Sequence, residues 1–331
     1  MKRIFLLLIA LLAFNAQAQP VNMPVEISRE YEVIVGSGDY SVSYAENYYQ
    51  NGPIKQLAGQ LVTVPSQIEN GINGILAGIA AEKDVIFISG SLQGNPLIQI
   101  APKSDGTALM TLAGVSYKAK AKKQLKVFGI VVASCTYELG INNISVVAQY
   151  GSIDGQISDE SVGFSGQPSV NTNCNGGVFN LLWPGIESWA EDLFDMALPN
   201  RIKSAMNTVK DKLLLVPDQN LLRGLNVLIP QGKTIQLPNG DVFPIGQYVH
   251  DNVAYLASKS TLTIEIGRGL TSAPQWAGYG TTVNTGDVLY LALDSPVISF
   301  DVLLTEKSTT EWSDECAAQI PGYEDYVFTC L

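Results

Sequence analysis

The chain has 331 residues, a formal net charge of −11 at pH 7 and an apolar share of 46%. Its charged share of 15% lies well below the about 25% of an average soluble domain, which excludes an acidic disordered protein. Thirty glycines and sixteen prolines without a fixed period exclude a collagen-like chain. The acidity argues against a protein that binds nucleic acid.

The first residues have the pattern of a secretory signal peptide. Lys2 and Arg3 precede the unbroken apolar stretch 4–14, and Ala16-Gln17-Ala18 supplies small residues for cleavage after Ala18. The stretch is too short to span a membrane, which takes about 20 residues, and no cysteine follows the cleavage point to carry a lipid anchor. We therefore expect a secreted or periplasmic chain without a transmembrane segment, in a compartment where disulfides persist.

Residues 19–50 hold five tyrosines, which form either an aromatic binding surface or ordinary strand packing. Residues 66–80 predict a helix, because Ser66 and Glu69 have capping-box spacing after Pro65. Its isoleucines and leucine share one face. Its glycines either let a ligand or another backbone approach, or simply weaken a helix that packs on a sheet.

Residues 115–139 alternate with a period of two, which predicts long extended structure with the odd positions buried. A single strand of that length is improbable, so we expect a bulge or tight turn near 122–124. Gly140-Ile141-Asn142-Asn143 predicts a second turn, followed by a strand over 144–150. The lysines of this region form either the solvent-exposed face of a strand or a patch that binds anionic lipid headgroups.

Residues 185–215 have helical periodicity, with a kink expected at Pro199. Alternating stretches then return near 261–266 and 298–304, and residues 305–331 are polar. Four cysteines allow three disulfide connectivities; proximity in sequence favours Cys135–Cys174 and Cys316–Cys330. No CxxC motif or Cys/His cluster suggests zinc or redox chemistry.

The order of these segments resembles the tubular lipid-binding superfamily, which includes bactericidal/permeability-increasing proteins. The resemblance covers roughly residues 108–268. It rests on the lysine-bearing strand Tyr117–Lys122 running into Cys135, the strand Ile144–Tyr150, the polar loop Gly166–Val170 before Cys174, the helix around Ile202–Met206 and the closing strand Ser260–Ile266. Cys135 and Cys174 look like that family's single disulfide.

The resemblance implies an α+β fold, in which a strongly curved antiparallel sheet wraps around a long kinked amphipathic helix. The expected organisation is a signal peptide (1–18), a lipid-binding domain (19–268) and a β-rich C-terminal extension (269–331). The function it implies is non-enzymatic binding or carriage of a lipid or acyl chain, with a membrane surface as a further partner and no cofactor or metal. The candidate lining residues, of cavity or core, are Ile72, Leu76, Ile79, Val127, Val131, Trp189, Leu193, Met196, Ile202, Met206 and Val209.

The alternative function is a secreted β-rich adhesin or envelope protein, which would have no use for the helix at 185–215. A hydrolase is the weakest hypothesis. His250 is the single histidine, no G-x-S-x-G motif accompanies it, and adjacent acids such as Asp159-Glu160 are typical of solvated loops.

Overall fold

The computed structural model describes residues 25–150, 163–175, 223–252, 255–256, 259–270 and 280–312. They divide into two compact units. The larger contains Glu30–Thr271 and Thr285–Glu306 and holds the hydrophobic core; the smaller takes its described residues from Met1–Arg29, Ser272–Asn284 and Lys307–Leu331. The functional argument below rests on residues of the larger unit.

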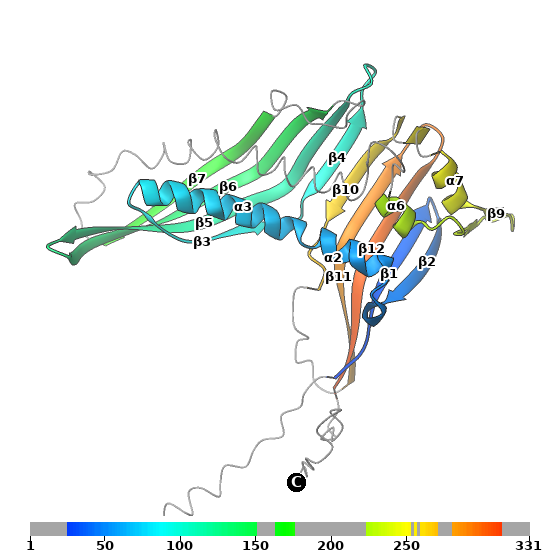
Figure 1. The fold of residues 1–331 in the computed structure, drawn as a ribbon, viewed down its shortest axis with the longest axis horizontal. Coiled ribbons are helices and arrows are strands. Elements are labelled where there is room, and N and C mark those ends of the chain that lie inside the picture. The colour runs from blue at the N-terminus through cyan, green and yellow to red at the C-terminus, as the bar shows by residue number, and fades with distance from the viewer. Residues whose placement is uncertain are drawn as a thin grey trace, which may run out of the picture. The chain divides into compact units, whose positions relative to one another are not determined.

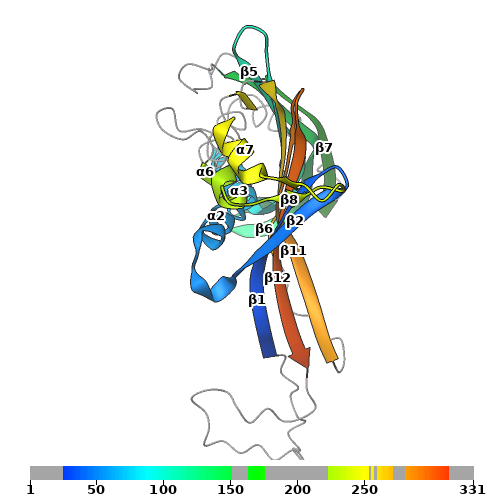
Figure 2. The same ribbon diagram turned by 90° about the vertical axis from the view of Figure 1, so that its right-hand side faces the viewer.

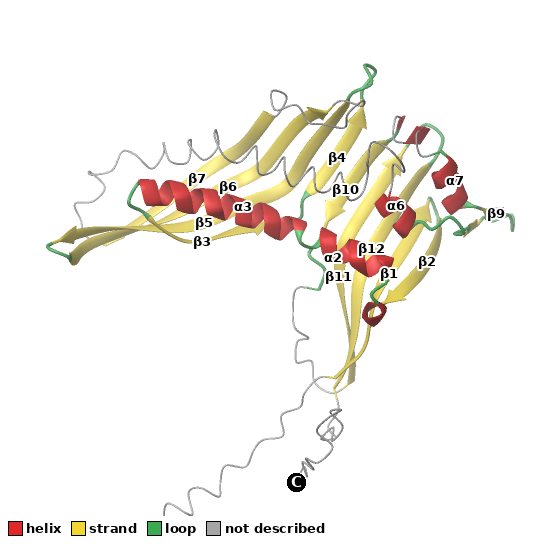
Figure 3. Cartoon of the chain, in the orientation of Figure 1, coloured by secondary structure: helices red, strands yellow, loops and turns green. Residues whose placement is uncertain are grey.

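The described chain is predominantly β (Figure 3). The strands are β1 (Val25–Ser37), β2 (Tyr40–Asn47), β3 (Ile86–Gln93), β4 (Leu97–Pro102), β5 (Ala108–Val127), β6 (Ile130–Tyr150), β7 (Gly163–Asn175), β8 (Ile235–Gln236), β9 (Val242–Phe243), β10 (Thr261–Ile266), β11 (Gly280–Asp294) and β12 (Ser299–Trp312). The helices are α2 (Pro53–Leu61), α3 (Val64–Glu82), α6 (Arg223–Leu228) and α7 (Ile245–Asp251), with one 3-10 turn, η1 (Tyr48–Gln50).

Ten strands form one sheet in the order β2-β1-β12-β11-β10-β4-β5-β6-β7 (Figure 1). The tenth, β3, pairs with β5 on the same edge as β4, which occupies the earlier part of that strand. The pairs β1–β2, β10–β11, β4–β5, β5–β6 and β6–β7 are all antiparallel. The short strands β8 and β9 form a separate hairpin, visible beside β2 in Figure 2.

The predicted α+β fold class is wrong, because the described chain is predominantly β. The structure is a large antiparallel sheet with one bent helix, in which only Val62 and Thr63 separate α2 from α3. The prediction failed because the period-two stretches extend further than expected, most clearly in β11 and β12. The helix predicted over 185–215 lies outside the described residues.

The predicted burial of odd positions in β5 is confirmed. Val115, Tyr117 and Ala119 are buried, whereas Lys118 and Lys120 are exposed. The position predicted for the bulge or tight turn, near 122–124, is a few residues too early, because β5 continues to Val127 with a register irregularity at Leu125/Lys126. The reversal occurs at Phe128 and Gly129, which both have positive φ.

The turn predicted at 140–143 is also wrong, because β6 runs through it. The pairing register of β6 shifts between Asn142 and Ser145, and Asn143 has a φ of 52°. An extra residue in a strand moves the following side chains to the other face. Burial accordingly passes from the odd positions before the bulge to Ile144 and Val146 after it.

The helix predicted over 66–80 is confirmed as α3, which lies alongside β3 (Figure 1). The apolar face of α3 is buried, as predicted. The prediction of a capping box at Ser66 and Glu69 is wrong. The helix begins at Val64 after Thr63, whose side chain makes no capping hydrogen bond, and Pro65 is tolerated in the first turn.

Glu69 does not cap its own helix; its carboxylate instead accepts a hydrogen bond from the free edge of β3. Its Oε2 accepts a hydrogen bond from the Leu92 amide at 2.8 Å. Asn73 Nδ2 donates to the Gly90 carbonyl at 3.3 Å, and Arg268 Nη2 donates to the Leu92 carbonyl at 2.9 Å. Three side chains therefore replace a neighbouring strand along the edge of β3 that faces away from β5.

Cys135 and Cys174 form a disulfide between β6 and β7, which confirms this predicted pairing. The two residues lie directly opposite each other in the register of the strands. The polar loop predicted at Gly166–Val170 is wrong, because these residues belong to β7. Cys316 and Cys330 lie outside the described residues.

Replacing Glu69 with leucine should lower the free energy of unfolding by about 1–3 kcal/mol, because the buried Leu92 loses the acceptor for its amide. Glu69→Gln is the control, since its amide oxygen keeps an acceptor at the same place and should lose less. Urea denaturation measures both. Equal losses in the two variants would show that the hydrogen bond is not what Glu69 contributes.

Removing the Cys135–Cys174 disulfide in a double serine variant should destabilise the protein by about 3–4 kcal/mol, given the chain segment that the cross-link closes. The sequence separation is 39 residues. Thermal unfolding followed by circular dichroism checks this result. An unchanged melting temperature would contradict it.

Candidate functional site

Three of the predicted lining residues lie on α3 and face the core. Ile72 and Leu76 are buried, and Ile79 is half-buried against the same cluster. The cluster includes Leu112 and Tyr117 of β5. The structure thus brings these α3 residues together with the sheet, as part of the packed interior.

Of the other predicted lining residues, the structure describes the side chain of Val131 alone. Val127 ends β5 and pairs across the turn with Ile130, while Val131 is 46% exposed. Six more lie outside the described residues: Trp189, Leu193, Met196, Ile202, Met206 and Val209. Their role as lining stays a prediction.

The most exposed apolar side chains of the described structure lie at the end of the β5–β6 hairpin. Phe128 is fully exposed, Ile130 is 69% exposed and Val131 follows it in β6. We call Lys126, Phe128, Ile130 and Val131 the tip patch. Single exposed apolar residues are ordinary, whereas a group of them marks a contact surface. The sequence showed apolar residues on both faces here but not the turn that exposes them.

Phe128 occupies a backbone conformation that does not suit it. Its φ is 51° and that of Gly129 is 80°, the pattern of a two-residue hairpin turn that favours Asn-Gly or Asp-Gly. A bulky residue with positive φ is uncommon and costs free energy. Nothing in the packing compensates, because the ring is fully exposed. An aromatic ring that is both strained and solvent-exposed points to a role outside folding.

Lysines follow the tip patch along β5. Lys118 and Lys120 are exposed on the outer face, and Lys120 Nζ lies 2.9 Å from Glu138 of β6. Lys126, beside the turn, is exposed, and Lys123 donates to the Lys83 carbonyl at 3.2 Å. The result is an apolar apex above a basic strand in a chain whose formal net charge is −11.

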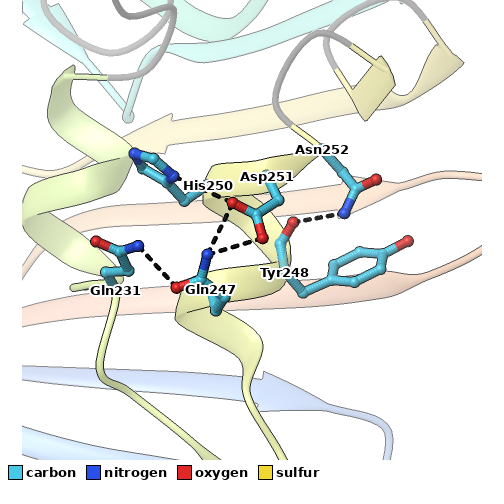
Figure 4. A network of polar contacts seen from close by, with 6 residues as sticks. All are labelled: Gln231, Gln247, Tyr248, His250, Asp251 and Asn252. Atoms are coloured by element: carbon cyan, nitrogen blue, oxygen red, sulfur yellow. Dashed lines mark hydrogen bonds and ion pairs between the residues drawn. The ribbon is translucent and has the colours of Figure 1, made fainter.

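His250 lies in a polar network on α7 (Figure 4). Its Nδ1 is 3.5 Å from Asp251 Oδ1, and both side chains are exposed. Gln247 donates to both oxygens of Asp251 and accepts from Gln231. Hydrogen bonds from Gln247 and then His250 lower the pKa of Asp251. Among the described residues, no group of three acidic, histidine or cysteine side chains is placed to hold a metal ion.

The tyrosines near the N-terminus mostly pack inward. Tyr31 is buried and Tyr44 and Tyr48 are half-buried. Lys55 Nζ lies 4.0 Å from the centre of the Tyr48 ring, and Lys233 lies equally close to that of Tyr44. Tyr49 alone of this group is largely exposed. These contacts favour ordinary strand packing over an aromatic binding surface.

Burial raises the pKa of Tyr117, and the Glu69 carboxylate raises it further. The Tyr117 hydroxyl donates to Asn73 Oδ1, so the network that closes β3 needs the neutral phenol. A side chain at Gly90 would collide with the Tyr117 hydroxyl and with Asn73. Burial also raises the pKa of Tyr44 and Tyr137.

These raised pKa values predict a loss of stability in alkali. An unfolded tyrosine ionises near pH 10, so the stability is fully present below about pH 10 and falls as the pH rises toward the folded pKa values. The part of the tyrosinate absorbance that comes from Tyr44, Tyr117 and Tyr137 should therefore appear together with unfolding. Tyr117→Phe should reduce this dependence in part. Ionisation of every tyrosine near pH 10 with the fold intact would contradict it.

No known family model and no curated protein matches the chain. A solved structure, the crystal structure of lipopolysaccharide binding protein, is similar to it with 11% sequence identity, over 85% of this chain and 79% of that chain, at a TM-score of 0.29. Such a score is too low to establish a common fold. The resemblance to the tubular lipid-binding superfamily therefore stays a prediction. No helix in the described part of the chain is long and apolar enough to cross a membrane.

Proposed function

We propose that the chain is an exported, non-enzymatic binding protein for a hydrophobic ligand, a lipid or acyl chain, and that it contacts lipid surfaces with its tip patch. The observation that carries the proposed contact with lipid surfaces is the fully exposed Phe128 ring in a turn that favours a small polar residue. The disulfide between β6 and β7 supports export, because disulfides persist in oxidising compartments.

The tip patch has the two components that interfacial binding needs. Burying an aromatic ring of this size contributes about 1.5–3 kcal/mol, and each lysine near an anionic membrane surface contributes about 1 kcal/mol. Phe128 and Ile130 supply the first component, and Lys126 supplies the second. The rest of the acidic chain is repelled by such a surface, so contact is favoured at the hairpin end.

The polar residues that the structure describes support the non-enzymatic part of the proposal. The single histidine is exposed, and its described contact is with Asp251. A nucleophile with its base and orienting group is the minimum for covalent hydrolysis. Binding an acyl chain needs no such group, because each buried methylene contributes about 0.8 kcal/mol before ordering costs.

Phe128→Asn should weaken binding to vesicles at least about tenfold, because it removes the ring, while leaving the turn at least as stable, since asparagine accepts positive φ. Flotation with vesicles of neutral and of partly anionic phospholipid measures the binding. Lys126→Gln should weaken binding only to the anionic vesicles, by about fivefold.

Two matched variants control for non-specific effects. Val297→Asn removes an exposed apolar residue from the β11–β12 turn, and Lys103→Gln removes a lysine at the opposite end of β5; both should bind as the unmodified protein does. Equal binding by Phe128→Asn would refute the tip patch. The proposal that the chain binds a hydrophobic ligand would be refuted if native mass spectrometry showed no co-purified lipid and the protein took up no fluorescent fatty acid.

A further inference from the structure

Among the residues that the structure describes, the strand β7 is an open edge of the sheet. It comes last in the strand order and pairs with β6 along one side only; no described strand pairs with its other side. It is 13 residues long, and nearly all of its described side chains are exposed on both faces. The disulfide at Cys174 holds it to β6. The strand is therefore presented in a fixed extended conformation.

The free edge of β3 is protected. Side chains of Glu69, Asn73 and Arg268 bond the free edge of β3, and β8 lies against β2 at the other end of the sheet. Natural proteins also protect edges with charged residues, above all lysine. Between Gly163 and Asn175 there is no charged residue; Pro168 is the one residue that limits strand addition.

The core-side face of β7 leaves an apolar residue uncovered. Val170 lies opposite Leu139, on the same face as Cys174 opposite the buried Cys135. It is 38% exposed, although Tyr137 and Ile141 beside it on β6 are buried. The apolar face of the sheet thus ends abruptly at Val170, in the middle of the open edge.

We infer that β7 pairs antiparallel with β7 of a second copy of the chain, about a two-fold axis at Val170. A two-fold contact requires a surface that complements itself. With the axis at Val170, the two valines cover each other, and Asn171 lies opposite Ser169 of the partner subunit. The next positions are also uncharged, so no like charges meet across the seam despite the net charge of −11. This inference does not depend on the proposed function.

Analytical ultracentrifugation over about 1–300 µM protein should show a monomer–dimer equilibrium. Val170→Lys places two like charges directly opposite each other and should weaken the dimer at least about tenfold. Gln167→Lys, on the same strand, faces Asn173 of the partner subunit and should weaken it less than about threefold. An equimolar mixture of Val170→Lys and Val170→Glu should restore the dimer.

The Val170→Lys variant should still fold, because the Val170 side chain is already 38% exposed and a lysine there does not have to enter the core. The test therefore reports on dimer formation rather than on folding. Melting temperature and the intact disulfide verify each variant. A monomer over the whole concentration range overturns the inference. So does a dimer that Val170→Lys leaves unchanged, or one that the charge-reversed pair does not restore.

Discussion

The structure depends on the burial of one apolar face of a very long antiparallel sheet. Side chains alternate between faces along every strand, so the strands must hold their register over their whole length. β5 and β6 are 20 and 21 residues long. The bulge between Asn142 and Ser145 changes which positions face inward, and the sequence changes with it, from Ile141 to Ile144 and Val146. Pairing and apolar pattern are therefore matched on both sides of the irregularity.

A sheet of this kind also has backbone groups at its edges that need partners. Along β3 they are bonded by polar side chains from α3 and from the segment after β10, so Glu69 and Asn73 contribute to the sheet rather than to the start of their own helix. At β7 no such side chain is found among the described residues, and the strand is instead fixed by a disulfide. The edge of β3 is bonded by side chains and the edge of β7 is not, among the described residues. This difference is why we infer that β7 is a contact surface.

The hairpin end shows a conflict between folding and function. A turn with positive φ at both positions favours asparagine and glycine, yet the first position is Phe128, with Ile130 and Lys126 on either side. Local preference and global fold normally agree, and departures from that agreement concentrate at functional sites. The contact with a lipid surface that we propose accounts for an exposed aromatic ring that makes no packing contacts.

The sequence by itself determined the burial of Val115, Tyr117 and Ala119 in β5, the helix near 66–80 and the Cys135–Cys174 pair, because periodicity and spacing are local properties. Only the tertiary structure decided where the chain reverses, that Gly166–Val170 pairs as a strand, and that Glu69 bonds Leu92 instead of capping α3. Each of these depends on a partner distant in sequence. The composition around Pro168 predicts a loop, and only the pairing with β6 makes these residues a strand. The sequence also did not predict the exposure of Phe128. An apolar residue predicts burial unless it is known to lie in a turn that keeps it out of the core.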